Sequence, residues 1–370
     1  HPRGTRGNDV IRNTAPTDAR AEPGAIRASV VVPARNCPAT LQRTLAALLA
    51  SDLPRADWEL IVVDDSSVDA TPDIAREMAD IVVTVTGGPR GPAFARNRGA
   101  EVARGATLVF VDADVCVHPD AVRRLVELLE IGTGAPSAAF GAYDTHPEAA
   151  GIVSQYRNLL HHYVHQTNAG PADTFWAGCG AVRRASFMSA GMFDQKRFPR
   201  PQIEDIDFGY RLTDHGEHIV LVPDIQGTHL KRWTLGRMLA TDYADRAVPW
   251  MRLMLERRSV ARPGSLNLRL AEKVFTALTG IVLVLVVVAV VMFDARYLVA
   301  AAVALVPVMI GNRQLLAWFG RERGIPFAVA VVPLRLLFYL TSGAGAATAI
   351  VLHLTEQLRR TPLAFRGVTQ

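Results

Sequence analysis

The sequence has few cysteines, almost no lysine and no recognisable nucleic-acid-binding motif. Its three cysteines are scattered without metal-ligand spacing, which argues against a disulfide framework and against a zinc module. Lysine is so rare that arginine supplies nearly all of the basic charge behind a net charge of +5. Because zinc-finger, RNA-recognition and helix-turn-helix signatures are absent, no nucleic-acid partner is expected. The positive charge instead favours an anionic phospholipid surface or phosphorylated substrates as partners.

The first residues also lack the apolar core of a secretory signal. Residues 1–27 are rich in arginine, glycine, proline and threonine, a composition typical of a disordered lead-in rather than of a signal peptide. We therefore expect the folded part that follows to remain in the cytoplasm.

Strand-like and helix-like segments alternate after this lead-in. Short apolar runs are expected to be strands at residues 29–33, 59–63, 81–85 and 107–111. The segments between and after them are expected to be helices, at residues 38–50, from 69 onward, at 91–104 and at 119–129. This order predicts an α/β domain with a doubly wound, mainly parallel sheet, which we place at residues 28–250. Periodicity weakens after residue 138, as expected for site-forming loops and short helices.

Two of the expected strands end in acidic clusters. Asp64 and Asp65 follow the second strand, and Asp112 and Asp114 form an Asp-x-Asp motif after the fourth. Open α/β sheets place their ligands at the carboxyl ends of their strands. An Asp-x-Asp at such an edge suits a hard divalent cation, Mn²⁺ or Mg²⁺, and that cation in turn suits a diphosphate. The pattern therefore predicts a catalytic domain that handles a nucleotide.

Apolar segments that approach or exceed membrane-spanning length follow this domain. They lie at residues 277–293, 297–310 and 327–354, the last interrupted by Pro333 and Arg335. We expect transmembrane or re-entrant helices over residues 273–356 and a basic tail at 357–370. A basic amphipathic segment at 251–272 is expected to lie at the interface against anionic phospholipid. Arginines beside the apolar segments predict a multi-pass protein of the cell membrane with its catalytic domain on the cytoplasmic side.

Several short motifs occur in an order that resembles the family 2 glycosyltransferases, which have the GT-A fold. They lie at residues 32–36, 63–71, 95–100, 112–114, 203–212 and 229–233. The last of them is similar to a signature of membrane-bound members such as ceramide glucosyltransferase and the cellulose and hyaluronan synthases. The resemblance covers residues 29–250 and implies a nucleotide-sugar donor, a UDP- or GDP-sugar.

The resemblance also implies roles for individual residues. The donor-binding residues would be Pro33, Arg35, Asn36, Asp64, Asp65, Arg96, Asp112, Gly178, Arg232 and Trp233. The metal ion would be held by Asp114 and Asp112, and His229 would either complete its shell or serve as a hydrogen-bonding histidine. A carboxylate in the motif at 203–212 would be the general base on the acceptor side. We assign this role to Asp205, with Glu204 orienting it or the acceptor.

Three histidines on one expected helix raise a second possibility for metal binding. His161, His162 and His165 have no acidic partner at ligand spacing. We therefore expect them in an acceptor groove or at the membrane interface rather than around a metal ion.

The sequence thus predicts an inverting, metal-dependent glycosyltransferase. Its acceptor is expected to be a membrane lipid, either a polyprenyl phosphate or a glycolipid. A processive polysaccharide synthase remains an alternative within the class, although a translocation channel normally needs more transmembrane helices. A sugar nucleotidyltransferase and an inactive sugar- or lipid-binding module are alternatives outside it.

Overall fold

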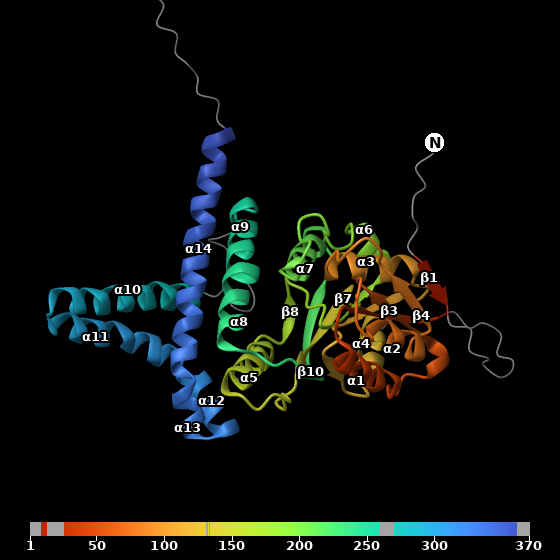
Figure 1. The fold of residues 1–370 in the computed structure, drawn as a ribbon, viewed down its shortest axis with the longest axis horizontal. Coiled ribbons are helices and arrows are strands. Elements are labelled where there is room, and N and C mark those ends of the chain that lie inside the picture. Colours follow the sequence, from red (N-terminus) through yellow and green to blue (C-terminus); the bar gives the residue numbers. More distant parts are fainter. Residues whose placement is uncertain (1–8, 13–25, 131, 133, 260–269, 361–370) are drawn as a thin grey trace, which may run out of the picture. The chain divides into compact units, whose positions relative to one another are not determined.

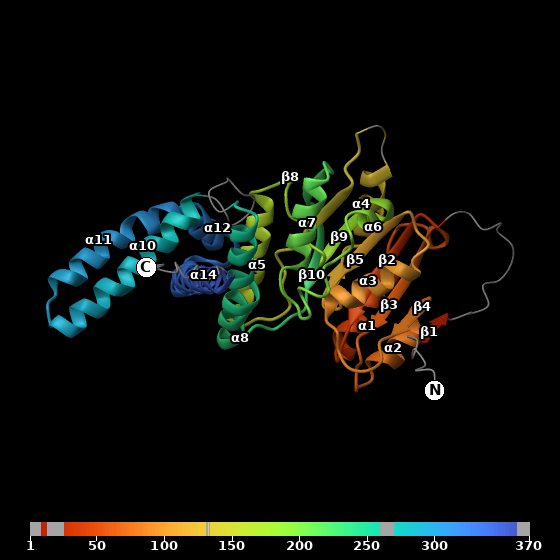
Figure 2. The same ribbon diagram turned by 90° about the horizontal axis from the view of Figure 1, so that it is seen from above.

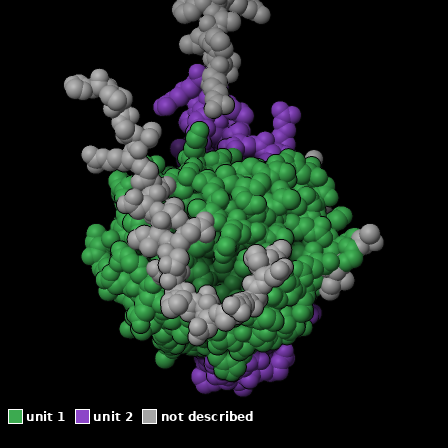
Figure 3. All heavy atoms as spheres, turned by 90° about the vertical axis from the view of Figure 1, so that its right-hand side faces the viewer, with its two compact units in different colours: residues 1–233, 265–267 green, residues 234–264, 268–370 purple. Residues whose placement is uncertain are grey.

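The computed structural model describes residues 9–12, 26–130, 132, 134–259 and 270–360. The chain divides into two compact units, coloured in Figure 3. Unit 1 comprises residues 1–233 and 265–267, and unit 2 comprises residues 234–264 and 268–370. This division after Trp233 comes earlier than the expected domain boundary at residue 250.

Unit 1 is built around one mixed sheet of ten strands (Figures 1 and 2). Along the sheet the order is β1-β4-β3-β2-β5-β9-β7-β10-β6, and β8 pairs with β10. The strands are β1 (Asp9–Arg12), β2 (Ala28–Ala34), β3 (Trp58–Asp64), β4 (Ile81–Thr84), β5 (Thr107–Val111), β6 (Val115–Val117), β7 (Ala138–Tyr143), β8 (Gly170–Ala172), β9 (Cys179–Arg183) and β10 (Ile219–His229).

The half of the sheet formed by β4, β3, β2 and β5 is parallel, as predicted. Successive residues of a strand face opposite sides of the sheet. Val30 and Val62 pack on one side, in a core shared with α1 (Pro38–Leu49), α2 (Thr71–Met78) and α4 (Ala121–Glu130). Val31 and Val63 pack on the other side, with α3 (Pro92–Val102), α6 (Arg184–Ser189) and α7 (Glu204–Asp214). The predicted α/β, doubly wound architecture is therefore confirmed.

The other half of the sheet is largely antiparallel. β9 is antiparallel to both β5 and β7, and β10 is antiparallel to β6 and β8 but parallel to β7. β7 is buried at every position and rich in alanine, so neither alternation nor β-branched residues mark it in the sequence. The register between β10 and β7 shifts between Leu221 and Gln226. For these reasons the sequence does not predict the strands after residue 138. The structure also has a 15-residue helix in this region, α5 (Ile152–Gln166).

The expected disordered lead-in over residues 1–27 is wrong for the short segment that forms β1. This strand pairs antiparallel with β4, with Val10 opposite Val83 and Ile11 opposite Val82. Valine and isoleucine favour extended backbone, and the pairing satisfies backbone groups that β4 would otherwise expose at the sheet edge. Residues 1–8 and 13–25 lie outside the described part of the chain.

Unit 2 is helical. It begins with the consecutive segments α8 (Leu235–Ala240), a π-helical stretch (Thr241–Ala247) and α9 (Val248–Glu256). After residues 260–269, which lie outside the described part, come α10 (Leu270–Met292), α11 (Arg296–Gly311), α12 (Arg313–Arg323), α13 (Ile325–Ala330) and α14 (Val332–Arg360). The expected interfacial segment at 251–272 falls partly on those undescribed residues, as does the tail at 361–370. The tail's first residues belong to α14.

Two helical segments of unit 2 are long and apolar enough to cross a membrane. They are Leu270–Met292 and Ile325–Arg359. A third crossing is possible by length and composition if α11 and α12, which meet at a 65° bend, form one broken span. The predicted apolar segments are therefore helical, and their number of crossings depends on how they lie in the bilayer.

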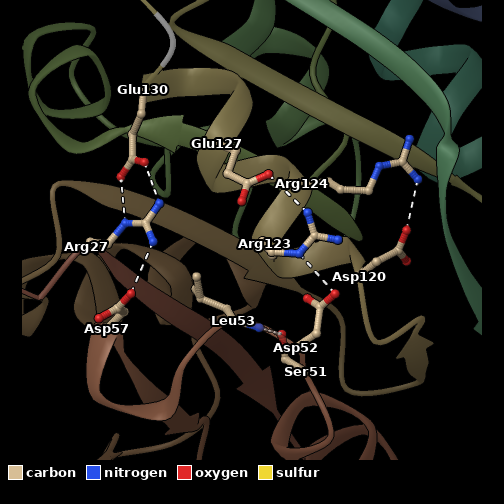
Figure 4. Close-up of polar contacts among 10 residues, drawn as sticks. All are labelled: Arg27, Ser51, Asp52, Leu53, Asp57, Asp120, Arg123, Arg124, Glu127 and Glu130. Carbon is tan, nitrogen blue, oxygen red and sulfur yellow. Dashed lines mark hydrogen bonds and ion pairs between the residues drawn. The ribbon is translucent and has the colours of Figure 1, made fainter.

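A group of exposed ion pairs lies on the surface of unit 1 around α4 (Figure 4). Arg27 pairs with Asp57 and Glu130 across the start of the sheet, and Arg123 pairs with Asp52 and with Glu127 one turn along its own helix. Both partners of each pair are substantially exposed, so solvent screening leaves such pairs little influence on stability. Five carboxylates face three arginines here, so the group has no excess of positive charge. These side chains do not form the basic patch that a phosphorylated ligand would need.

Candidate active site at the carboxyl ends of the strands

A buried arginine lies at the centre of the candidate site. Arg96, on α3, has a side chain only 6% exposed. Its Nη2 donates to Asp112 Oδ1 at 2.6 Å and its Nη1 donates to Glu204 Oε1 at 2.8 Å. Burial disfavours its charge, but Asp112 and Glu204 outweigh that effect and raise the pKa of Arg96. One guanidinium thus joins the acidic motif after β5 to the acidic start of α7.

The Asp-x-Asp motif follows β5 directly, and its two carboxylates differ in environment. The backbone N–H of Asp112 donates to Gly178 O at 3.2 Å, which fixes the motif beside β9. Burial raises the pKa of Asp112, and Arg96 only partly offsets this. Burial acts in the same direction on Asp114, but the hydrogen bond and charge of His229 and the charge of Lys231 outweigh it and lower the pKa of Asp114. Asp114 is therefore the member of the motif that stays ionised most readily.

His229 faces Asp114 from the end of β10. The distance from its Nε2 to Asp114 Oδ2 is 3.6 Å, and its Nδ1 lies 2.5 Å from Asn158 Oδ1 on α5. Its ring stacks on Tyr143 at 4.3 Å with an interplanar angle of 6°. When Nδ1–H donates to Asn158, Nε2 is the ring atom left facing Asp114. It can hydrogen-bond to the carboxylate as an N–H, or bind a cation that lies between the two side chains as an unprotonated nitrogen.

This arrangement fits a divalent cation as part of a larger shell. A 3.6 Å separation is compatible with an imidazole nitrogen and a carboxylate oxygen that each bind one ion at about 2.1 Å. Within the described residues, no group of three or more His, Cys, Asp or Glu side chains is placed to hold a metal ion by itself. The protein can therefore supply part of a coordination shell here, and the remaining ligands have to come from substrate and water.

The acidic start of α7 presents three carboxylates with different partners. Glu204 is buried and accepts hydrogen bonds from Arg96 and from the backbone N–H of Gln202. Asp207 is buried and accepts from Arg211 Nε at 2.9 Å. Asp205 is partly exposed and accepts from the backbone amides of Ala177 at 3.2 Å and Ile206 at 2.9 Å. Among the described residues, no cationic side chain forms a hydrogen bond or ion pair with Asp205, in contrast to Glu204 and Asp207.

The environment of Asp205 also makes it more basic than an ordinary aspartate. Burial contributes most, and the negative charge of Glu204 adds to it, so the pKa of Asp205 rises to about 7 despite the opposing charge of Arg96. A carboxylate with a pKa close to the operating pH is suited to accepting a proton. The geometry therefore favours Asp205, over Glu204 and Asp207, for proton transfer.

The loops after β2 and β3 are joined to each other by hydrogen bonds. Asn36 has a positive φ of 48°, which lets its backbone N–H donate to Ser67 Oγ while its Oδ1 accepts from Val68 N. Asp65 accepts from the backbone N–H groups of Arg90 and Gly91, both at 2.8 Å, and so fixes the entry to α3. Asp64 Oδ1 accepts from Ser67 N at 3.3 Å. These residues form a rigid rim, with Pro33 at the end of β2.

The remaining residues expected at the donor site take no part in the hydrogen bonds between these two loops. Arg35 and Arg232 are exposed, and within the described part of the chain neither forms an ion pair. Trp233 is buried, with Lys231 Nζ 4.5 Å and the Arg157 guanidinium 5.6 Å from its ring centroid. A side chain at Gly178 would strike the Trp176 ring, since an added Cβ would lie 2.4 Å from it.

Some residues of α5 that support the site are not marked by any motif in the sequence. Asn158 orients His229, and Ser154 Oγ accepts from the backbone N–H of Trp233 at 2.8 Å. Two of the three histidines expected in an acceptor groove or at the membrane interface have structural contacts instead. His162 and His165 are buried and contact the carbonyl oxygens of Tyr143 and Gly141 on β7. These two histidines pack α5 against the sheet. In the sequence, a buried helix face that carries histidines cannot be distinguished from a helix face that binds a ligand.

Comparison with known proteins places the first part of unit 1 in a family. Residues 29–190 match the model described as Glycosyl transferase family 2. Glycosyltransferase AglE of Haloferax volcanii is 25% identical over 250 residues, 65% of this chain and 78% of AglE. Validoxylamine A glucosyltransferase of Streptomyces hygroscopicus subsp. jinggangensis is 30% identical over 220 residues, 51% of this chain and 51% of that protein.

A solved structure shares the fold. Mannosyltransferase PcManGT from Pyrobaculum calidifontis, in complex with GDP-Man and Mn²⁺, matches with a TM-score of 0.51 at 19% identity, over 94% of this chain and 92% of that chain. Together with the sequence matches and the mixed sheet, this likeness identifies the fold as GT-A. The chain therefore carries a glycosyl transferase family 2 domain and is a glycosyltransferase.

Proposed function

We propose that this glycosyltransferase moves a sugar from a UDP- or GDP-sugar to a membrane lipid by a single, inverting displacement that depends on Mn²⁺ or Mg²⁺. The observation that carries the proposal is the state of Asp205. It is the carboxylate at the start of α7 that no cationic side chain pairs, and its pKa is raised to about 7. A single displacement by an acceptor hydroxyl requires one base on the acceptor side, and Asp205 has both the access and the basicity for that role.

The donor would lie over the carboxyl ends of β2, β3 and β5. The rim formed by Asn36, Asp64 and Asp65 would hold the nucleoside, with Pro33, Arg35 and Gly178 beside it. Asp112, positioned by Arg96, would contact the ribose or the ion. Asp114 and His229 would hold the divalent ion, whose charge stabilises the departing nucleoside diphosphate. This assignment extends to the present chain the kind of donor and ion that the mannosyltransferase with this fold contains.

The acceptor side follows from the same residues. As the acceptor hydroxyl attacks the anomeric carbon, Asp205 would take its proton at a carboxylate oxygen, and the amides of Ala177 and Ile206 would hold that carboxylate in place. Glu204, neutralised by Arg96, would fix the start of the helix. Arg232 is exposed and free to approach the diphosphate, while Trp233 would shape the acceptor entrance.

A lipid acceptor is supported by unit 2. Its candidate spans tether the enzyme to a bilayer, where a polyprenyl phosphate or glycolipid would be the natural acceptor. The basic flanks of the apolar segments favour a cytoplasmic catalytic domain, where nucleotide-sugars are available. In this proposal residues 28–250 supply the chemistry and residues 273–356 supply the membrane attachment.

A donor screen with membrane lipid extract tests this function. We expect one nucleotide-sugar to release its nucleoside diphosphate when lipid extract and Mn²⁺ or Mg²⁺ are present. Release of pyrophosphate would identify a sugar nucleotidyltransferase instead. Binding of a donor without release of either product, under every metal and lipid condition, would leave only a binding module.

The reaction should depend on pH through Asp205. Because the base must be ionised and its pKa is about 7, kcat should fall about tenfold per pH unit below pH 7 and level off above it. The measurement is kcat from pH 5 to pH 9 at saturating donor with a lipid-alcohol acceptor, which has no titrating group of its own in this range. A flat profile across this range would remove Asp205 as the base.

A further inference from the structure

The helices α10 and α11 form an apolar hairpin. They run antiparallel, joined by a turn that contains Asp294, and residues such as Val284, Val287 and Val291 are exposed along α10. A helix of 23 residues is about 35 Å long, enough to cross a hydrocarbon core of about 30 Å. The hairpin therefore has the length and the surface of a membrane-spanning pair.

A polar network marks the base of this hairpin. Arg335, on the first turn of α14, donates from Nη2 to Glu272 at 2.8 Å and from Nε to Asn312 Oδ1 at 2.8 Å. Glu272 lies at the start of α10 and Asn312 directly after α11. Tyr339 Oη contacts Asn312, and the Arg335 guanidinium lies 4.5 Å from the Tyr339 ring centroid. α10 and α14 thus begin at the same level, and charged groups at that level point to the headgroup region.

α14 packs along a helical segment of unit 2 that carries several charged side chains. Tyr243 Oη lies 2.8 Å from Thr348 Oγ1, Arg252 Nη2 donates to Glu356 Oε1 at 2.8 Å, and a Cβ at Gly345 would lie 2.5 Å from Ala247 Cβ. The second half of α14 therefore runs alongside the π-helical stretch and α9. That partner carries Asp242, Asp245, Arg246, Arg252 and Glu256.

These charges decide how α14 can lie. If α14 crossed the bilayer, its partner would carry several ionised side chains into hydrocarbon, which is costly for each of them. The part of α14 before this contact, residues 332–344, is about 20 Å long and too short to cross by itself. Figures 1 and 2 show the hairpin extending crosswise from α14, and Figure 1 shows it on the side opposite α9. A bilayer crossed by α10 cannot also be crossed by α14.

The free side of α14 is apolar. Ile350, Val351, Leu354 and Leu358 are exposed and, at this spacing, share one face of the helix. Gly345 and Glu356 lie on the other face, against the polar partner. An exposed apolar stripe backed by charged residues is the pattern of a helix that lies in the membrane surface.

We propose that α14 is an interfacial helix that lies in the headgroup region with its apolar stripe toward the acyl chains, and that only the α10–α11 hairpin crosses the bilayer. The Glu272–Asn312–Arg335 network fixes the hairpin to this helix at the membrane surface. Exposed Arg313 and Arg321 on α12, directly after the hairpin, suit an anionic lipid surface. The chain then crosses the membrane twice, and its C-terminus lies on the same side as unit 1.

Topology reporters on the full chain test this arrangement. Fusions of a fluorescent protein or of alkaline phosphatase to the C-terminus are compared, in a bacterial inner membrane, with the same reporters inserted at Asp294. We expect fluorescence and no phosphatase activity at the C-terminus, and the reverse at Asp294. Phosphatase activity at both the C-terminus and Asp294 would show a further crossing after the hairpin and would overturn the proposal.

Depth measurements separate an interfacial helix from one outside the membrane. Azidophenylalanine is introduced at one position at a time: at Leu354, at Val287 in the hairpin, or at Val68 on unit 1. Its azide group is then coupled to a spin label, so the native cysteines need not be used. The full-length protein is measured in nanodiscs. We expect the label at 354 to be less accessible to oxygen than the label at 287, and less accessible to a water-soluble nickel complex than the label at 68. A label at 354 that matches either reference would contradict the proposal.

Discussion

Asp205→Asn should lower kcat by at least ~10²-fold while leaving donor affinity within a few-fold of wild type, the usual scale for loss of a general base. Asparagine cannot accept the acceptor proton, yet its Oδ1 can still accept one of the two backbone amides that hold Asp205. The variant should therefore fold. The measurement is kcat with a lipid-alcohol acceptor, together with donor Kd by calorimetry. Asp73→Asn, the same change on a side chain 77% exposed on α2, is the matched control and should be neutral.

The neighbouring acids make this experiment informative in either direction. A nearly silent Asp205→Asn combined with an inactive Glu204→Gln or Asp207→Asn that folds normally would move the base to that neighbour. A phosphate acceptor gives a third pattern, because it is largely ionised near pH 7 and needs no base. A modest loss with a polyprenyl phosphate and a large loss with an alcohol would keep Asp205 as the base and identify the acceptor class.

Asp114→Ala should abolish metal-dependent turnover, with a loss of more than ~10²-fold, as expected when charge stabilisation at a leaving group is removed. Asp114 is the member of its motif whose pKa is lowered, and it faces the Nε2 of His229, so its removal takes away a principal ligand of the proposed ion. EDTA should abolish turnover of the wild type, and Mn²⁺ or Mg²⁺ should restore it. Mn²⁺ binding, measured by electron paramagnetic resonance in the presence of donor, should weaken in parallel.

Asp120→Asn is the control for this variant. Asp120 lies six residues further along and pairs with Arg124 in an exposed contact drawn in Figure 4, so its loss should leave both turnover and Mn²⁺ binding unchanged. Full activity of Asp114→Ala in EDTA would show that the reaction needs no ion at this position, and the metal assignment would fail.

The parallel half of the fold could be predicted because its signals are local. Each of β2, β3 and β5 is an apolar run buried on both faces, and the helices between them begin with proline or pack leucines on one face. The antiparallel half could not, because β7 is made of small residues and the shape of β10 depends on its neighbours. Tertiary packing, rather than local preference, determines these strands.

The same contrast holds for the site. The acids at strand and helix ends could be identified because each one stands in a motif of a few consecutive residues. The contacts that distinguish them could not, because Arg96 joins residues from α3, β5 and α7 that are far apart in the chain. The partner of His229, Asn158, lies on a helix whose sequence carries no ligand motif. Only the folded chain shows which of these carboxylates is paired with a cationic side chain and which is not.

The measurement that tests the central claim most directly follows the sugar itself. Full-length enzyme is incubated with membrane lipid extract, a divalent ion and the nucleotide-sugar found in the donor screen, labelled in its sugar, and the organic and aqueous phases are then counted. We expect labelled sugar in the organic phase in a one-to-one ratio with released nucleoside diphosphate, and none with Asp205→Asn and an alcohol acceptor. Label that stays entirely in the aqueous phase as free sugar or soluble polymer would contradict transfer to a lipid.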